Sequence, residues 1–409
     1  CSLDEISEKV RKQVLSDIDV SRDLEDEEIW DIISRAASAE VKQKSISLRD
    51  RIELEKRVFD SLKRLDVLQE LIDDTEVTEI MVNGPDSIFY EKNGCIQQYD
   101  GRFSSEEKMQ DIIQQIVGRH NRVVNQSSPI VDTRLVDGSR VNIVLFPISL
   151  GGSAISIRKF PKEPYNMEKL IAIGSVSEEV SEMLKLLVKA KYSIFISGGT
   201  GSGKTTFLNA LSQYIPEDER IITIEDSAEL QLLGAKNIVR METRNANVEG
   251  VMPITIRDLI RTALRMRPDR IIVGECRGAE TLDMLSAMNT GHDGSLSTGH
   301  ANSCRDMLSR METMVLMGQE LPLSAIRSQI ASGINIIIQL GRLRDKSRRV
   351  LEIAELDGIV DGEIVLNTLY QFEEISEKNG RVIGELVQKG KLKSRTNLEA
   401  AGMRDIDGL

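Results

Sequence analysis

The stretch Ser193-Ile-Phe-Ile-Ser-Gly-Gly-Thr-Gly-Ser-Gly-Lys-Thr-Thr206 decides the fold of this chain. Its first residues are β-branched and aromatic, which is typical of a short buried strand, and residues 205–211 open a helix. The G-x-x-x-x-G-K-T spacing between them lets backbone N–H groups face phosphates at the N-terminus of the helix. A chance glycine turn is the alternative, but the flanking strand and helix are the context that the motif requires. The sequence therefore predicts a triphosphate-binding loop.

Different residues of this loop are expected to contact different parts of a nucleotide. Lys204 is expected to reach the β- and γ-phosphates, and the Thr205 hydroxyl is expected to bind a magnesium ion. ATP and Mg²⁺ are therefore the expected cofactors. The expected nucleotide-binding residues are Gly198, Gly199, Thr200, Gly201, Ser202, Gly203, Lys204, Thr205 and Thr206.

Length and composition predict several domains and argue against one class of partner. With 409 residues the chain exceeds what one core usually holds, so two or three domains are expected. The 53 lysines and arginines are outnumbered by 65 aspartates and glutamates, which gives a net charge of -12. Because nonspecific nucleic-acid binders normally carry a basic excess, no nucleic-acid partner is expected.

The cysteines and the apolar runs predict a cytoplasmic protein. No C-x-x-C pair occurs among the four scattered cysteines, Cys1, Cys95, Cys276 and Cys304. The apolar run over 334–340 is too short to span a bilayer, which needs about 20 residues. No signal peptide is visible, and a first residue of cysteine suggests that the true N-terminus is missing. Membrane contact is therefore expected to be peripheral and made through partners.

The pattern of predicted strands and helices changes along the chain. Strands near 193, 221, 270, 295 and 335 alternate with helices near 204, 255, 279 and 303, which predicts an α/β fold with a mainly parallel sheet. The expected division is a helical region over 1–70, a small α/β domain over 71–160, a proline-containing linker over 161–168, the parallel-sheet domain over 169–372, and a C-terminal hairpin and tail over 373–409.

Two further buried strands end in acidic residues. One ends at Glu225, followed by Asp226 and Glu229, and the other ends shortly before Glu275. Ligands of parallel sheets bind outside the carboxyl ends of the strands, so these acids should share a crevice with Lys204. Glu275 is the first choice for a magnesium-side acid that positions or deprotonates water, and Glu225 is the second. For Glu225, Asp226 and Glu229, the alternative is that their negative charge only caps the next segment.

Two of the three histidines flank a predicted strand. His292 precedes it and His300 follows it, and with no cysteine pair or third histidine close by a zinc site is not expected. A histidine beside a phosphate crevice can respond to the γ-phosphate, although a packing role is the alternative.

Several arginines are candidates for phosphate contacts. One helix face carries three arginines four residues apart, which indicates either phosphate or subunit contact or a solvated, salt-bridged face: Arg257, Arg261 and Arg265. Three arginines of the small domain are candidate arginine fingers, with ordinary surface charge as the alternative: Arg134, Arg140 and Arg158.

In order, the segments resemble the motifs of the type II/IV secretion system ATPases, most closely the CpaF/TadA branch that serves tight-adherence (Tad) pilus assembly. The similar segments are 198–206 (Walker A), 224–230 (Asp box), 265–277 (Walker B) and 291–302 (His box). Residues 77–85 and 135–142 are similar to the N-terminal domain of that branch. The tetracysteine zinc module of type II secretion ATPases has no counterpart here.

This resemblance implies a RecA-like P-loop motor domain behind a PAS-like α/β domain, six copies in a ring, and nucleotide bound between the two domains. It implies that the catalytic and metal-side glutamates are Glu225 and Glu275, in an order left open, and that His300 senses the nucleotide. The Walker B segment adds Arg265 and Arg277 to the arginine candidates. The implied partners are inner-membrane platform proteins of a pilus system.

The resemblance predicts ATP hydrolysis that drives assembly or secretion of Tad/Flp-type pilus subunits. Within the family, a pilus retraction motor or a DNA-conjugation ATPase is the nearest alternative. Outside it, the alternatives are a RecA-like DNA translocase and a switch or small-molecule kinase with the same loop.

Overall fold

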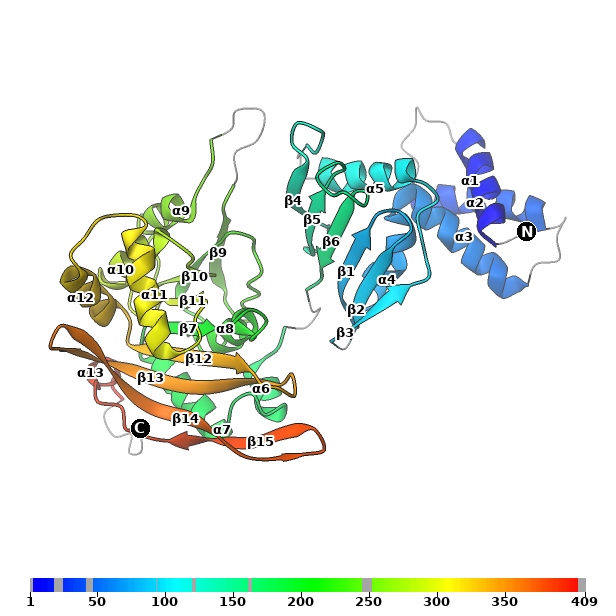
Figure 1. Ribbon diagram of the computed structural model, residues 1–409. Helices are drawn as coiled ribbons and strands as arrows, with labels where there is room; N and C mark the ends of the chain where they lie inside the picture. The colour runs from blue at the N-terminus through cyan, green and yellow to red at the C-terminus, as the bar shows by residue number, and fades with distance from the viewer. Residues whose placement is uncertain are drawn as a thin grey trace. The chain divides into compact units, whose positions relative to one another are not determined.

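The computed structural model describes residues 3–17, 25–41, 47–92, 94–119, 123–160, 164–244 and 252–403. Cys1 and residues 161–163 of the expected linker lie outside the described residues. The chain divides into two compact units, Cys1–Lys162 and Glu163–Leu409, whose helices and strands are labelled in Figure 1.

The first unit begins with the predicted amphipathic helices. They are α1 (Leu3–Asp17), α2 (Asp26–Val41) and α3 (Leu48–Lys63), and each contacts the other two. Their apolar stripes meet in a small core in which Trp30 stacks on Phe59, with ring centroids 4.6 Å apart. The Ser47 side chain caps α3 by accepting the Asp50 N–H. The short η1 (Asp66–Leu68) and α4 (Gln69–Asp73) follow.

A six-stranded antiparallel sheet forms the rest of this unit, in the order β3-β2-β1-β6-β5-β4. Its strands are β1 (Val77–Asn83), β2 (Ile88–Lys92), β3 (Cys95–Tyr99), β4 (Ile130–Arg134), β5 (Arg140–Val144) and β6 (Ala154–Arg158). One face packs on α5 (Glu106–Gly118), because alternate residues such as Val141, Ile143 and Ile157 are buried with its apolar side chains. The intervening residues occupy the other face.

The second unit contains a nine-stranded sheet in the order β15-β14-β13-β12-β7-β11-β10-β8-β9. The strands from β12 to β9 are parallel, and β13, β14 and β15 continue the sheet antiparallel. The predicted α/β class with a mainly parallel sheet is therefore confirmed. The parallel strands are β7 (Ile194–Gly198), β8 (Arg220–Glu225), β9 (Asn237–Glu242), β10 (Arg270–Val273), β11 (Leu296–Gly299) and β12 (Ile336–Arg342).

Helices cover both faces of this sheet, so its central strands β7, β11 and β10 are buried throughout. Ile194 and Ile196 of β7 enter one core cluster and Phe195 enters the other. The first cluster contains α6 (Met167–Ala172), α7 (Glu178–Lys189) and α8 (Lys204–Ser212). The second contains α9 (Ile256–Ala263), α10 (Glu280–Met288), α11 (Cys304–Leu316) and α12 (Leu323–Gly333).

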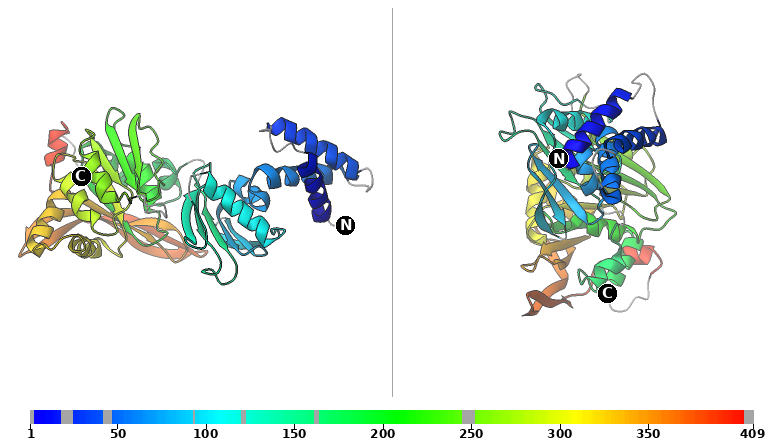
Figure 2. Two further views of the ribbon diagram at one scale, coloured as in Figure 1. Left: turned by 90° about the horizontal axis from the view of Figure 1, so that it is seen from above. Right: turned by 90° about the vertical axis from the view of Figure 1, so that its right-hand side faces the viewer.

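The antiparallel extension is a long ribbon, seen from further sides in Figure 2. It consists of β13 (Arg348–Val360), β14 (Glu363–Lys378) and β15 (Arg381–Gln388), followed by α13 (Thr396–Ala400). The expected boundary at residue 372 falls inside β14, so the C-terminal hairpin is continuous with the large sheet.

Candidate functional site: a phosphate loop beside two glutamates and a histidine

The phosphate loop, residues 198–206, connects buried β7 to α8 at the carboxyl end of the sheet. Gly201 and Gly203 have φ values of 72° and 93°, which other residues rarely adopt. A Cβ on Gly198 would lie 2.5 Å from Ser202 Oγ and 2.8 Å from the Leu340 carbonyl oxygen, so only glycine fits there. The backbone thus takes the tight path that the motif predicts.

Lys204 begins α8, and its ammonium folds back over the loop. Its Nζ donates to the carbonyl oxygens of Gly198 at 3.1 Å and Gly199 at 3.0 Å, and it lies 3.3 Å from His300 Nδ1. Burial, partly offset by the charge of Glu275, lowers the pKa of Lys204. The lysine is therefore held at the loop by weak neutral acceptors that phosphate oxygens could replace.

Glu275 follows β10 and stands beside this lysine. Its Oε2 accepts from Arg277, with Nε at 2.8 Å and Nη2 at 2.6 Å. Its Oε1 lies 2.5 Å from His300 Nε2, yet the contact is not aligned as a hydrogen bond, and this buried oxygen has no hydrogen-bond partner among the described residues. The backbone before it is fixed by Thr298, whose hydroxyl donates to the Gly274 carbonyl.

His300 follows β11 and lies between Lys204 and Glu275. An ammonium can only donate, so Nδ1 acts as an acceptor and the proton of the neutral ring belongs on Nε2. Burial, helped by the charges of Lys204, Arg277 and a further arginine on α11, lowers the pKa of His300 against the opposing effect of Glu275. The ring is therefore neutral near pH 7.

Glu225, at the end of β8, has a different role in the structure. Its side chain is 3 % exposed, and its Oε1 accepts the N–H groups of Glu229 at 2.7 Å and Leu230 at 2.8 Å. Burial raises the pKa of Glu225 to about 7, although the two N–H groups oppose this shift. Of the two glutamates, Glu275 is the one whose charge acts on Lys204. The geometry therefore favours Glu275 as the acid at the phosphates and Glu225 as the support of the loop after β8.

The other acidic and histidine candidates lie at both ends of the sheet. Asp226 accepts from the Thr243 hydroxyl at 3.3 Å, and the charges of Asp226 and Glu229 act on Arg277, so these residues share the carboxyl end. His292 precedes β11 and its Nδ1 lies 3.2 Å from the Ala287 carbonyl oxygen. His292 and His300 are thus at opposite ends of one strand, and only His300 reaches the phosphate loop.

The helix-face arginines form ion pairs. Arg257 Nε and Arg261 Nε lie 2.6 Å and 3.1 Å from the carboxylate of Asp283 on α10, which matches the salt-bridged alternative. Arg265 lies just beyond α9 and is exposed.

The three arginines of the first unit form one cross-strand row. Arg134 on β4 is opposite Arg140 on β5, which is opposite Arg158 on β6. Directly opposed residues share a face, so the row lies on the face away from α5. Arg140 and Arg158 each lie 4.0 Å from a carboxylate, Asp132 and Glu79 respectively.

Two positioning residues were not predicted from the sequence. Gln339, buried in β12, donates to the Ala301 carbonyl at 3.1 Å and so holds the segment after His300. The sequence signal that could have identified Gln339 is a glutamine inside an apolar run. Arg348 Nε donates to the Gly201 carbonyl at 2.8 Å, and no local pattern marks this arginine.

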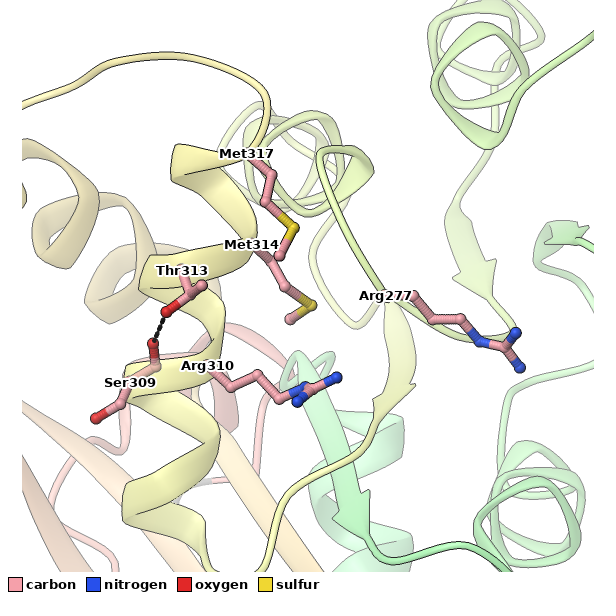
Figure 3. Close-up of a pocket in the computed structure, with 6 residues that line it drawn as sticks. All are labelled: Arg277, Ser309, Arg310, Thr313, Met314 and Met317. Carbon is pink, nitrogen blue, oxygen red and sulfur yellow. Dashed lines mark hydrogen bonds between the residues drawn. The ribbon is translucent and has the colours of Figure 1, made fainter.

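A pocket of about 270 Å³ adjoins the site (Figure 3). Arg310 and Met314 of α11 line it together with Arg277, whose side chain extends away from that helix. The remaining lining residues are Ser309, Thr313 and Met317.

The residues present fit a magnesium-bound triphosphate. Ser202 Oγ and Glu275 Oε1 are buried oxygens with no hydrogen-bond partner among the described residues, and buried polar atoms are nearly always paired. Hydroxyl and carboxylate oxygens are what Mg²⁺ and its bound waters prefer. Thr205 and Glu275 are the residues expected to hold the ion, the latter partly through water.

The chain is similar in sequence to proteins of secretion systems and in fold to a solved motor protein. The model of the family described as "Type II/IV secretion system protein" matches residues 61–389. A Mycobacterium tuberculosis relative named "Putative conjugal transfer protein" is 35% identical over 71% of this chain and 84% of its own length. The type IV secretion system protein PtlH of Bordetella pertussis is 32% identical over 72% of this chain and 95% of its own length. The solved structure of the pilus retraction motor PilT with ADP shares the fold, with a TM-score of 0.54 and 23% identity over 81% of this chain and 84% of that one.

Proposed function

We propose, because the chain belongs to the type II/IV secretion system protein family, that it is an ATP-hydrolysing motor of a secretion or pilus system. The observation that carries the proposal is the contact series at the phosphate loop, in which His300 lies 3.3 Å from Lys204 Nζ and 2.5 Å from Glu275 Oε1. A switch or small-molecule kinase needs the loop but has no use for this histidine between lysine and glutamate.

The residues suggest how hydrolysis would proceed. Lys204 would exchange the Gly198 and Gly199 carbonyls for β- and γ-phosphate oxygens, which are stronger, charged acceptors. Glu275 would orient the attacking water and take its proton on Oε1. As the water oxygen bonds to the γ-phosphorus, the bond between that phosphorus and the bridging β-phosphate oxygen breaks and ADP leaves. When bound, Mg²⁺ would neutralise the phosphate charge. His300 would link the lysine to the glutamate.

The arginine row supports a role for the first unit in this chemistry. The three arginines are directly opposed across neighbouring strands, so their side chains share one face of the sheet. We propose that Arg134, Arg140 and Arg158 bind the γ-phosphate charge as it develops, a contribution worth about a thousandfold in rate where arginine fingers occur.

The more specific proposal is a Tad-type pilus assembly motor. It rests on residues 77–85 and 135–142, which are similar to the N-terminal domain of that branch. We further propose a hexameric ring at the cytoplasmic face of the membrane, attached through platform proteins. Within the described residues, the structure contains no helix long and apolar enough to cross a membrane. The rival proposals are a DNA-conjugation ATPase and a pilus retraction motor. The first comes from the conjugal-transfer name of one relative, and the second from the likeness in fold to the retraction motor PilT.

The enzymatic proposal is tested with the purified full chain. Wild type should hydrolyse ATP, and Lys204→Ala should abolish turnover while leaving the circular dichroism spectrum unchanged. Full activity in the variant would refute the site assignment. Strong stimulation by single-stranded DNA would instead favour a DNA translocase.

The cellular role is tested by replacing the chromosomal copy with Lys204→Ala. An assembly motor predicts cells without surface pili and with pilin retained in the membrane. Excess pili would indicate a retraction motor, and loss of DNA transfer with normal pili would indicate a conjugation ATPase. Neighbouring genes for prepilins and two polytopic platform proteins would support the Tad assignment independently.

A further inference from the structure

We propose that Arg348 is a positioning residue for ATP binding, which holds the tip of the phosphate loop through the Gly201 carbonyl. The inference rests on the proposed function and adds a residue outside its four motif segments. Arg348 Nε donates to the Gly201 oxygen at 2.8 Å across 147 residues of sequence. Its Cδ also lies 3.4 Å from where a Cβ on Gly203 would be, so the side chain rests on the outer surface of the loop.

The geometry of the peptide unit explains how this contact would act on phosphate. In a trans peptide, the carbonyl of Gly201 and the N–H of Ser202 point in opposite directions. Holding the carbonyl outward toward Arg348 therefore directs the Ser202 N–H inward, where it now lies 3.3 Å from the Gly199 carbonyl oxygen. Inward N–H groups are what this loop offers to phosphates.

The glycines at the tip of the loop explain why such a support would matter. Gly201 and Gly203 have positive φ values, and glycine-rich backbone has more conformations to lose than any other when it is ordered. A peptide that flips at residue 201 would turn the Ser202 N–H away from the phosphates. The guanidinium of Arg348 opposes this flip with a charge-assisted hydrogen bond.

Arg348 is well placed because its own backbone is fixed. The Ser175 hydroxyl donates to the Arg348 carbonyl at 2.7 Å, and the Val350 N–H donates to the Ser175 carbonyl. The next residue, Arg349, donates to the carbonyls of Gly174 and Val382. The start of β13 is thus anchored on both sides, and its Arg348 side chain reaches the loop.

The strand order separates this contact from the chemistry. β7 lies between β12 and β11. His300 approaches the loop from the β11 side, whereas Arg348 approaches from β13, beyond β12. A residue on the side away from Glu275 should affect how tightly ATP is held more than how fast it is cleaved. Uniform binding of this kind appears in KM and leaves kcat nearly unchanged.

Two substitutions separate the hydrogen bond from the charge. Arg348→Met keeps the stem and removes every donor, whereas Arg348→Gln places an amide nitrogen where Nε lies and removes the charge together with the two terminal nitrogens. In the full chain, KM for ATP should rise about tenfold in Arg348→Met, with kcat within about twofold. Arg348→Gln should return KM to within about threefold of wild type. Equal thermal unfolding and equal oligomeric state of the variants exclude a folding or assembly defect.

Arg342→Ala is the matched control, because Arg342 pairs with Arg348 across the same hairpin and its loss removes the same charge. An equal rise of KM in this control, an unchanged KM in Arg348→Met, or a Gln variant as impaired as the Met variant would each overturn the inference while the enzyme remains an ATPase. A wild-type chain that neither binds nor hydrolyses ATP would overturn the proposed function, and this inference with it.

Discussion

His300 Nδ1 lies 3.3 Å from Lys204 Nζ, which places the imidazole between the phosphate-loop lysine and Glu275. Lys204 begins the helix that follows β7, and His300 follows β11, so the contact depends on the parallel register of these neighbouring strands rather than on sequence proximity. A triphosphate tail that draws Lys204 forward would break this contact, and His300 would then be free to reorient toward the γ-phosphate.

The contact predicts a strong effect of His300 on turnover. His300→Asn keeps an acceptor near Lys204 but removes Nε2 from Glu275, whereas His300→Ala removes both contacts. Both variants should lose about 10-fold to 100-fold in kcat, as loss of a group that acts in proton transfer or alignment does. Steady-state ATPase assays check this. Wild-type kcat in the Asn variant would show that the Glu275 side of the ring has no role.

Substitutions of Glu275 and Glu225 should have different effects on the kinetics of ATP hydrolysis. Glu275→Gln should lower kcat by about 100-fold or more while ATP still binds, because the carboxylate that orients and deprotonates water is lost. Glu225→Gln keeps an oxygen for the Glu229 and Leu230 N–H groups and should retain most activity near pH 7. Single-turnover assays with calorimetric ATP binding distinguish the two. The reverse ranking would make Glu225 the base.

Glu225 also predicts a pH dependence of stability. Its folded pKa of about 7 is raised above the ordinary glutamate value of 4.5, so the folded state keeps a proton that the unfolded state releases between these values. Stability therefore falls as pH rises from about 4.5 to 7, by on the order of 3 kcal/mol from this group, and levels off above. Glu225→Gln should lack this component in thermal unfolding measured from pH 4.5 to 8. A difference between variant and wild type that does not grow with pH would contradict it.

Gly274 predicts a steric link between the two acids. A Cβ at residue 274 would lie 2.9 Å from Glu225 Cγ, which is closer than carbon atoms approach in proteins. Gly274→Ala should displace Glu225 or the following Glu275, cost about 1–3 kcal/mol of stability, and lower kcat. Gly118→Ala is the control, since nothing lies within 4 Å of its added Cβ. Equal thermal stability and activity of both variants would disprove the link.

Much of the site was predictable because its members are local features. The phosphate loop and Glu275 each follow an apolar strand, His300 follows a strand between glycines, and parallel strands present their carboxyl ends at one edge. β9 was not predicted, because its half-exposed residues form no apolar run.

The remaining contacts depend on which strands become neighbours. Arg348 reaches Gly201 only because β13 pairs with β12 and β12 pairs with β7, and periodicity carries no information on that order. The choice between Glu225 and Glu275 depended on burial and on the two N–H groups of the loop after β8. The ion pairs of Arg257 and Arg261 likewise needed Asp283 from another helix.

Arg270 supplies the sharpest test of what holds the motor domain together. Its guanidinium is fully buried and donates to Glu219 with Nε at 2.5 Å and Nη2 at 3.0 Å, and to the carbonyls of Gly294 and Val188. Glu219→Gln removes the opposing charge and leaves the buried cation uncompensated, so it should lower the free energy of unfolding by about 3–5 kcal/mol. Glu217→Gln, which breaks the exposed pair with Lys236, should cost under about 1 kcal/mol. Because the two glutamates are two residues apart, chemical denaturation of both variants isolates the effect of burial. Equal losses would mean that solvent screens the Arg270 pair as well.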